Sequence, residues 1–509
     1  MTGIFLFYKK NQHKWPKNLR TQANKLKHRG NEQVKTVQNA SFFGKFFINH
    51  AQRDNYEQFH TIKTQDGNLL LEVVDGSIYN MVSIMNITLK SGHYPHLFLL
   101  DAYKQIGLEL FTKLKGPFAI LMKSKKEIII ARDPVGTKPI YLLNSNKALI
   151  ISSELKSISN FVGVPEILEP GTVFIYDFIT DNVRYEKFFN LEQFLNAPIL
   201  KRVNVFTVKK KLYKMLEIAV KKSINVPCKI GALLSGGIDS TVICAIAQKF
   251  VPDLNIYTVV AENSSDLSHA IDFTKMYPNT QHHIYNLKIE DLLQVVPDVI
   301  YHLETFDAPL IRSALPMYYL TSKVDEMTGL LLTGEGGDEL FGGYNYFKNL
   351  SDTKLRNEFV KLLKIEHATG LQRVDRIPYA FQLEARAPWF DINIVKFAFS
   401  LPMNLKIYKS KDILIEKWII RETFKDIIPK SVFNRKKAKF SEGVGSQFLL
   451  RDYCNEQISD EEFNQNKEIS PGIFVNNKEE LYYWRIFSSL FQPKKDFIEN
   501  LPRTEVWIY

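Results

Sequence analysis

Two glycines stand between an apolar run and an amphipathic segment in LLSGGIDSTVICAIA, residues 233–247. Because glycines lack side chains, backbone N–H groups in such a turn can approach an anion closely. The N-terminus of the helix that follows presents its positive end to the same anion. The segment therefore predicts a strand, a phosphate-binding loop and a helix. A plain turn that joins strand to helix is the alternative.

The hydrophobic pattern differs on the two sides of residue 205. Residues 1–205 contain short, alternating, β-prone pieces such as GIFLFY and TVFIYDF, which predict a multi-strand antiparallel domain. One helix is expected over 97–112, where apolar residues recur at helical spacing. Residues 206–509 alternate apolar runs with helical segments, which predicts a parallel sheet covered on both faces. Beyond Asp352 the pattern is mostly helical.

Length, charge and cysteine content narrow the functional classes. A chain of 509 residues is long enough for two domains, each with its own core. The formal net charge of +11 is spread along the chain without a recognisable nucleic-acid motif, so we expect no nucleic-acid partner. Cys228, Cys244 and Cys454 are isolated and lack CxxC spacing, which fits a reducing compartment. No run of about 18 apolar residues occurs, so we expect a cytoplasmic protein without a membrane span.

A second glycine-rich segment, LLLTGEGGDELFGGY at 330–344, also follows an apolar run. Loops at the carboxyl ends of parallel strands border one crevice, so we expect both segments at one site. The first segment lacks the Lys-Ser/Thr ending of a Walker loop. It resembles instead the SGGxDS loop of enzymes that split ATP into AMP and pyrophosphate; there a carboxylate beside the polyphosphate is unfavourable unless a cation lies between them, so this resemblance implies that Asp239 binds Mg²⁺. An acidic surface turn is the alternative for the second segment.

Seven blocks in the second half of the chain occur in the order found in one enzyme family. They are LLSGGIDS, SSDL, VIYHLETFDAPLIRSALPMYYL, TGEGGDELFGGYNYF, LEARAPWFD, RKKAKFSEGVG and KEELYYWRIF. With these blocks the chain resembles the class II, glutamine-dependent asparagine synthetases, in a wider family that includes β-lactam synthetases and lasso-peptide cyclases. The resemblance implies an α/β multidomain fold. Residues 1–205 would form an Ntn-hydrolase-like antiparallel αββα sandwich, and residues 206–509 a doubly wound parallel sheet of the PP-loop ATP pyrophosphatase type.

The resemblance also implies an ATP-dependent, amide-forming ligase. A carboxylate would attack the α-phosphate of Mg-ATP to give an acyl-adenylate and pyrophosphate, and ammonia would then displace AMP. Glu335 favours an open amide over ring closure, and FSEGVG and EARAPWFD match the asparagine synthetases better than the cyclising members, so aspartate is the leading acid. Two alternatives stay open: another carboxylate, in specialised or cell-surface metabolite biosynthesis, and a non-catalytic ATP-binding regulatory protein. A homodimer is one expected assembly.

Matching positions carry individual roles over from the family. Pyrophosphate and Mg²⁺ binding would fall to Ser235, Gly236, Gly237, Asp239, Ser240 and Asp338. The residues expected to flank the adenosine are Leu234, Val259 and Gly334. Glu335 matches the acid that accepts the proton lost as ammonia attacks, and Lys437 matches the lysine that stabilises charge developing on the phosphates.

The first half of the chain resembles the glutaminase domain of the family in LKHRG, GPFAI, ARDPVGTKPIYLL, SSELKSI and PGTVFIYD. The family begins Met-Cys-Gly-Ile and uses the cysteine thiol as its nucleophile, whereas this chain has Thr2. A threonine can serve as an N-terminal nucleophile in other hydrolases. The substitution alone therefore leaves activity open.

The glutamine pocket differs as well. Where the family has Asn-Gly-Glu-Ile-Tyr-Asn, this chain has DGSIYN. Asp75 would bring negative charge towards a developing oxyanion, and Ser77 is too short to replace the glutamate. His93 or a neighbour replaces the acid that binds the amino group of glutamine. Together these changes predict an inactive glutaminase and a ligase supplied with ammonia or another amine.

Overall fold

The computed structural model describes residues 2–10, 14–30, 33–48, 60–65, 68–88, 97–200, 203–261, 266–410, 413–435, 446–499 and 501. It divides into two compact units, Met1–Leu191 and Glu192–Tyr509.

The division falls earlier than the boundary that the hydrophobic pattern indicates near residue 205. Residues 192–200 belong to the second unit because they pack on it. The N–H of Leu200 donates to the carbonyl oxygen of Ser400 at 2.9 Å. The ring of Phe194 stacks on that of Phe399, with centroids 4.5 Å apart.

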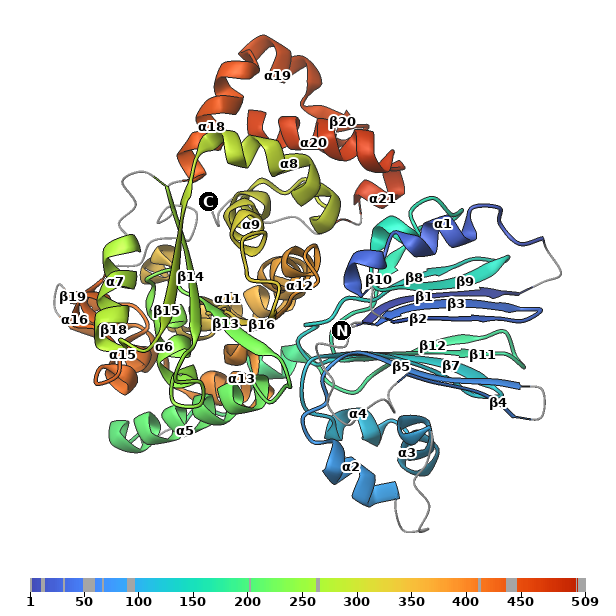
Figure 1. The fold of residues 1–509 in the computed structure, drawn as a ribbon, viewed down its shortest axis with the longest axis horizontal. Helices are drawn as coiled ribbons and strands as arrows, with labels where there is room; N and C mark the ends of the chain where they lie inside the picture. Colours follow the sequence, from blue (N-terminus) through green and yellow to red (C-terminus); the bar gives the residue numbers. More distant parts are fainter. Residues whose placement is uncertain are drawn as a thin grey trace. The chain divides into compact units, whose positions relative to one another are not determined.

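Two six-stranded antiparallel sheets form the first unit (Figure 1). In spatial order the first sheet consists of β10 (Glu166–Ile167), β8 (Tyr141–Asn144), β9 (Ala148–Ser152), β1 (Thr2–Lys9), β3 (Phe42–Ile48) and β2 (Gln33–Gln38). The second consists of β12 (Val183–Lys187), β11 (Thr172–Asp177), β7 (Glu127–Arg132), β6 (Phe118–Lys123), β5 (Asn68–Gly76) and β4 (His60–Gln65).

One face of each sheet is buried against the other sheet. Successive side chains of a strand point to opposite faces, so every second residue enters the space between the sheets. Ile4 and Leu6 of β1 share a core with Leu71 of β5. Phe5, between them, points to the other face and packs edge-on against Phe43 of β3. The main core of this unit therefore lies between the two sheets.

Helices lie outside both sheets, so the predicted αββα sandwich is confirmed. α2 (Met81–Thr88), α3 (Phe98–Ile106) and α4 (Glu109–Lys113) share a hydrophobic core with the second sheet. Near the first sheet lie α1 (Leu19–Asn24), η1 (Lys27–Arg29) and η5 (Leu155–Ser157). The single helix expected over 97–112 is wrong: Gly107, with a φ of 58°, ends α3 and separates it from α4.

A five-stranded sheet organises the second unit, and all its neighbouring strands run parallel. In spatial order the strands are β15 (Gln281–Leu287), β14 (Asn255–Ala261), β13 (Lys229–Leu233), β16 (Thr328–Leu332) and β17 (Glu384–Arg386). The chain moves outward from β13 to β15 and then returns to the other side of β13, which is a doubly wound order. The predicted fold class is confirmed. The winding reverses between β13 and β16, and ligands bind at such points.

Helices connect and flank these strands. Before β16 they are α5 (Val205–Ser223), α6 (Ile238–Ala247), α7 (Asp266–Met276), α8 (Ile289–Leu303) and α9 (Ala308–Thr321). After β16 they are α10 (Gly337–Phe341), α11 (Asp352–Ile365), α12 (Gly370–Tyr379), α13 (Ile392–Ser400), α14 (Met403–Lys406), α15 (Trp418–Phe424), α16 (Lys430–Asn434), α18 (Ser446–Gln457), α19 (Asp460–Asn466), α20 (Lys478–Phe491) and α21 (Lys495–Glu499).

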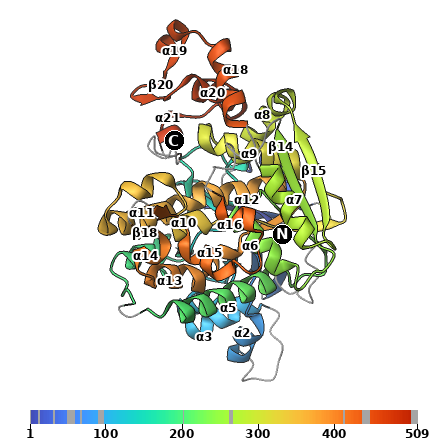
Figure 2. The ribbon, with the colours of Figure 1, turned by 90° about the vertical axis from the view of Figure 1, so that its left-hand side faces the viewer.

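Short elements complete the second unit. They are η6 (Leu191–Leu195), which crosses the division, η7 (Asn345–Asn349), η8 (Glu366–Ala368), η9 (Pro388–Phe390) and the hairpins β18 (Tyr408–Ser410) with β19 (Ile413–Ile415) and β20 (Glu468–Ser470) with β21 (Ile473–Phe474). Figure 2 shows α18 and α20 side by side near α8, with which both are in contact. Within the described ranges, no helix has the length and apolar character needed to cross a membrane.

Candidate nucleotide and amide-forming site

A pocket lies at the carboxyl ends of β13 and β16, where the winding of the sheet reverses. The first glycine-rich segment lines it through Ser235, Gly237 and Ser240. The second lines it through Gly334 and Glu335, among others. The two segments therefore border one crevice, as the parallel-sheet pattern predicts.

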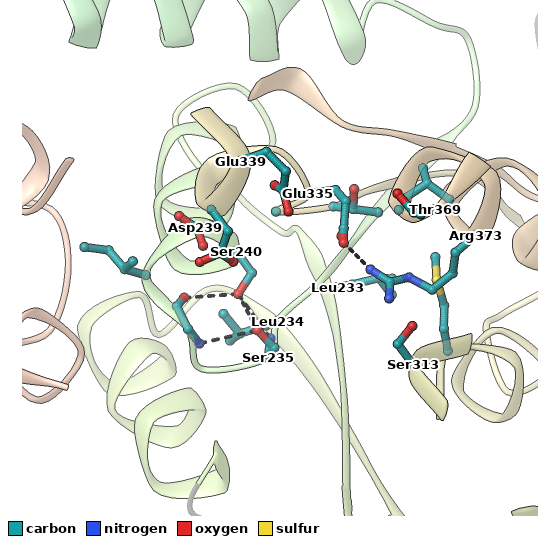
Figure 3. Close-up of a pocket in the computed structure, with 18 of the residues that line it drawn as sticks. Leu233, Leu234, Ser235, Asp239, Ser240, Ser313, Glu335, Glu339, Thr369 and Arg373 are labelled. Carbon is teal, nitrogen blue, oxygen red and sulfur yellow. Dashed lines mark hydrogen bonds and ion pairs between the residues drawn. The ribbon is translucent and has the colours of Figure 1, made fainter. Parts of the chain in front are cut away.

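The first segment turns tightly through its own serines. The backbone N–H of Ser235 donates to Ser240 Oγ at 3.2 Å, and the two hydroxyl oxygens lie 3.0 Å apart (Figure 3). Gly236 has a φ of 67°, and a Cβ there would lie 2.6 Å from the carbonyl oxygen of Asp266. Helix α6 starts after Gly237 without a side-chain cap. Its first N–H groups therefore suit an anion at the pocket.

The two glycine-rich segments contact each other. A Cβ on Gly334 would lie 2.5 Å from the backbone nitrogen of Ser240. A Cβ on Gly337 would lie 2.1 Å from Asp239 Oδ1. Any side chain at either glycine would overlap the other segment, so the close approach depends on both.

The two acids predicted to bind a metal share a buried lysine. Lys417 makes ion pairs with both Asp239 and Asp338 and is only 1% exposed. The backbone of Lys417 is left-handed, with a φ of 54°, directly before α15. This lysine was missed in the sequence, because IEKWII carries no motif and the contact with Asp239 spans 178 positions.

Glu335, the predicted proton acceptor, points towards α12, where its carboxylate makes an ion pair with Arg373 (Figure 3). The neighbouring carboxyl of Glu339 is buried and accepts a hydrogen bond from the Tyr344 hydroxyl. Burial, with the nearby carboxylates of Asp338 and Glu335, raises the pKa of Glu339 to about 7. This part of the pocket is thus rich in carboxyl groups.

Arg312 of α9 also lines the pocket, and the sequence alone did not single out this basic residue. Its Nε donates to Glu479 Oε1 at 3.0 Å, and the Tyr483 hydroxyl donates to the same oxygen at 2.9 Å. Both partners belong to α20. A helix near the end of the chain therefore fixes a basic group in the pocket wall.

The remaining predicted residues fall into three groups. Leu234 and Val259 line the pocket beside Tyr257. Gly236 forms the turn rather than the pocket wall. Lys437 lies outside the described residues, as does His93. The roles assigned to all these residues stay predictions.

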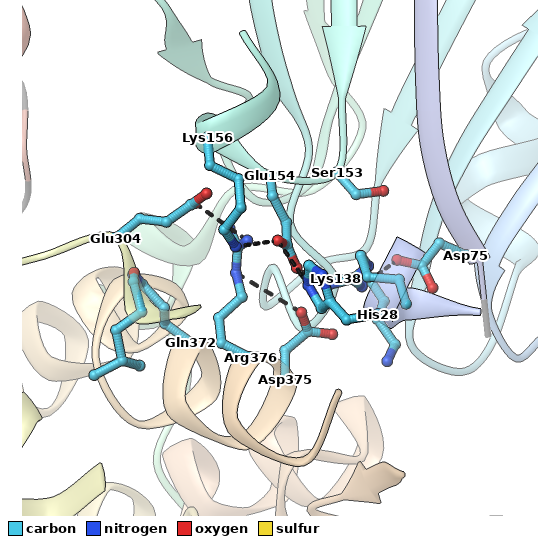
Figure 4. A network of polar contacts seen from close by, with 12 residues as sticks. His28, Asp75, Lys138, Ser153, Glu154, Lys156, Glu304, Gln372, Asp375 and Arg376 are labelled. Carbon is cyan, nitrogen blue, oxygen red and sulfur yellow. Dashed lines mark hydrogen bonds and ion pairs between the residues drawn. The ribbon is translucent and has the colours of Figure 1, made fainter. Parts of the chain in front are cut away.

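In the first unit, Thr2 and Asp75 belong to a buried polar network, part of which Figure 4 shows. The N–H of Thr2 donates to Asp75 Oδ1 at 3.2 Å, and Arg29 Nη2 donates to Asp75 Oδ2 at 2.7 Å. Arg29 Nη1 also donates to Glu154 Oε1 at 2.9 Å. The carboxylate of Asp75 is therefore paired with a guanidinium directly beside residue 2.

Further groups surround this network. His28 and Lys156 both contact Glu154 (Figure 4). Burial lowers the pKa of His28, although the Glu154 carboxylate acts in the opposite direction. Ser77, which follows β5, donates its N–H to the carbonyl oxygen of Pro117 at 2.8 Å.

Both parts of the chain match known protein families. The family model described as asparagine synthase matches residues 211–361 and 349–501, and the glutamine amidotransferase domain model matches residues 1–205. The chain is 29% identical to asparagine synthetase (glutamine-hydrolyzing) 1 of Arabidopsis thaliana, over 83% of this chain and 75% of that protein. It is 30% identical to a probable asparagine synthetase (glutamine-hydrolyzing) of Acanthamoeba polyphaga mimivirus, over 86% of this chain and 85% of that protein.

Among solved structures, glutamine phosphoribosylpyrophosphate amidotransferase from B. subtilis aligns with a TM-score of 0.28 and 16% identity. That alignment covers 55% of this chain and 65% of the other. A score this low carries no argument about the fold, which follows from the strand orders given above.

Proposed function

This chain belongs to the asparagine synthase family and is an ATP-dependent carbon–nitrogen ligase, and on that basis we propose that it converts aspartate to asparagine with ammonia from solution. One observation carries the proposal: the contact between the two glycine-rich segments at the carboxyl ends of β13 and β16. That contact joins an anion-binding turn, two carboxylates and Glu335 in one pocket.

In the first step, a carboxylate oxygen of the acid attacks the α-phosphorus of ATP, and the bond to the β-phosphate breaks. The turn from Ser235 to Ser240 would hold the departing pyrophosphate, because the uncapped start of α6 offers N–H groups to an anion. Leu234 and Val259 would contact the adenosine. The products of this step are an acyl-adenylate and pyrophosphate.

Asp239 and Asp338 would hold Mg²⁺. Their carboxylates already converge on one cationic group, the ammonium of Lys417, so this donor set suits a cation. In the described part of the chain, no three His, Cys, Asp or Glu side chains gather as a metal site. That agrees with an ion such as Mg²⁺, which takes one or two carboxylates and fills its shell with phosphate oxygens and water. When bound, it would neutralise charge on the polyphosphate.

In the second step, the nitrogen lone pair attacks the acyl carbon. The C–N bond forms and the C–O bond to AMP breaks. Glu335 would accept a proton from the nitrogen, and its ion pair with Arg373 would hold the carboxylate in position. The products are the amide and AMP.

The polar contacts of the first unit bear on the source of the nitrogen. An oxyanion needs hydrogen-bond donors, but Asp75 accepts hydrogen bonds from Thr2 and Arg29 and is paired with the guanidinium. Thr2 and Asp75 are both fully buried. These contacts support a scaffold role for the first unit and an external supply of ammonia.

The test is a paired assay of the purified protein with Mg-ATP and aspartate, given either ammonium or glutamine. We expect asparagine, AMP and pyrophosphate in equal amounts with ammonium. With glutamine we expect only background product. Glutamine-driven asparagine with matching glutamate release would refute the inactive glutaminase, and ADP in place of AMP would refute the ligase mechanism.

A second candidate keeps this chemistry and changes the acid. The α9 wall presents Pro309, Leu310 and Met317 to the pocket beside Arg312. An apolar wall next to one basic group would suit a carboxylic acid that is less polar than aspartate. Pyrophosphate release measured with a panel of acids discriminates the two. A better substrate with an apolar side chain would favour this second candidate.

A further inference from the structure

One buried carboxyl group in the pocket has no role in the chemistry above. Glu366, in η8, lines the pocket and is 4% exposed. Thr369 Oγ1 donates to its Oε2 at 3.1 Å, whereas its Oε1 has no hydrogen-bond partner among the described residues. A buried polar atom without a partner is costly, so its presence points to a ligand that supplies the missing contact.

The position of Gly370 places this oxygen next to Glu335. A Cβ on Gly370 would lie 2.1 Å from Glu366 Oε1 and 3.3 Å from Glu335 Cγ. Both acidic side chains therefore border the space above one glycine that lines the pocket. Arg373, on the same helix as Gly370, pairs with Glu335 and leaves Oε1 of Glu366 without a donor.

The proposed supply of nitrogen requires two proton acceptors. Near neutral pH, ammonia in water is mainly the ammonium ion, which carries four protons, and the amide product keeps two of them. Glu335 accounts for one of the two protons that leave. Ammonia released inside an enzyme from glutamine would lose only one.

We propose that Glu366 Oε1 binds the incoming ammonium ion and takes its first proton, and that Glu335 takes the second. In the first transfer an N–H bond breaks, the proton passes to Glu366, and neutral ammonia remains. Its lone pair then forms the C–N bond while the electrons of the C–O bond leave with AMP, and Glu335 removes a proton from the nitrogen. This inference rests on the proposed function and names its nitrogen subsite.

The electrostatic surroundings of Glu366 agree with this role. Burial, together with the carboxylates of Glu339 and Glu335, raises the pKa of Glu366 well above its ordinary range. A carboxylate with a raised pKa is a stronger base and closer in proton affinity to ammonia. A cation bound beside it favours the ionised form, so the ammonium ion itself makes the acceptor available.

The test compares two nitrogen nucleophiles in the Glu366→Gln variant, with aspartate and Mg-ATP as the other substrates. Hydroxylamine is mainly uncharged near neutral pH and loses only one proton. We expect kcat/KM for ammonium to fall about 100-fold, the low end for loss of a general base, while kcat/KM for hydroxylamine changes less than about threefold. Glu358→Gln is the matched control, because Glu358 accepts a hydrogen bond from Tyr346 at 3.0 Å and does not line the pocket.

Equal losses with both nucleophiles, or no loss with either, would overturn the assignment of Glu366. ATP–pyrophosphate exchange with aspartate reports whether the variant folds and activates the acid. If exchange is lost, Glu366→Asp decides the matter, because it keeps a carboxylate. We expect Glu366→Asp to recover part of the ammonium-dependent rate. The inference would be overturned if the ratio of the ammonium rate to the hydroxylamine rate were as low in Glu366→Asp as in Glu366→Gln.

The wild-type protein separates this inference from the proposed function. A wild type that forms no asparagine from ammonium overturns both. A wild type that uses ammonium, with a Glu366→Gln variant that uses it equally well, overturns the nitrogen subsite alone.

Discussion

Lys406, the last residue of α14, is fully buried in the second unit. Its Nζ lies 4.1 Å from the ring centroid of Phe359 and 5.0 Å from that of Phe399. In the part of the chain that the structure describes, this ammonium has no hydrogen-bond partner. Burial, and to a smaller extent the Arg356 guanidinium, lowers the pKa of Lys406 from 10.5 to about 7.

The sign of the resulting pH dependence follows from proton binding. Between pH 7 and 10.5 the unfolded chain holds a proton on Lys406 that the native protein lacks, so the free energy of unfolding rises with pH across this window. The slope is about 1.4 kcal/mol per pH unit. Below pH 7 Lys406 is charged in both the native and the unfolded state, and burial of its ammonium group then lowers the free energy of unfolding by about 5 kcal/mol.

Replacing the amine with an apolar group of similar length should remove this penalty. We expect Lys406→Met to unfold at higher urea concentration than the wild type at pH 7, with a difference that shrinks as pH rises towards 10. Tryptophan fluorescence during urea unfolding at several pH values measures it. Lys354→Met, which changes an exposed lysine of α11, is the control and should show no such trend. A Lys406→Met difference that is constant with pH, or a wild type more stable than the variant at pH 7, would refute the reasoning.

Three further predictions concern the two sites. Glu335→Gln should slow amide formation about 10²- to 10⁴-fold while ATP–pyrophosphate exchange continues; equal loss of both would contradict a role in the second step alone. Gly337→Ala should abolish ATP binding in calorimetry, because its Cβ would lie 2.1 Å from Asp239 Oδ1; wild-type affinity would contradict the close contact. Asp75→Asn removes one of the two buried carboxylates that pair with Arg29 and keeps only Glu154, so we expect a melting temperature several degrees lower and still no glutamate release from glutamine. An unchanged melting temperature would show that this pair contributes little.

The parts of the site that local chemistry dictates were predictable from the sequence. The glycines around Ser235 and Gly334 indicate tight turns, and the acids beside them indicate a charged ligand. The apolar run before each segment indicates that both turns lie at the ends of strands. The parallel sheet followed from alternating apolar and helical segments, because parallel strands require crossovers, whereas its doubly wound order was expected from the family resemblance. These features depend on neighbours in the sequence.

Other parts depend on contacts between distant segments. Lys417 and Arg312 look like ordinary basic residues, and only the fold brings them to Asp239 and to Glu479. Glu366 stands in a helical stretch without a motif, between the half-buried Ile365 and His367, so the sequence around it gives no sign of its role. The division after residue 191 lies before the expected boundary near residue 205, because the segment before α5 is held by contacts with distant residues, such as the ring of Phe194 on that of Phe399.

The reciprocal contact of Gly334 and Gly337 with the Ser240 and Asp239 turn has an evolutionary consequence. At either of these two glycines an added methyl group would overlap the first glycine-rich segment. A substitution at either glycine therefore requires a compensating change in the first segment, which restricts how the two segments can change during evolution. None of the atoms closest to these two glycines belongs to α9, so residues of the α9 wall can change without disturbing this contact.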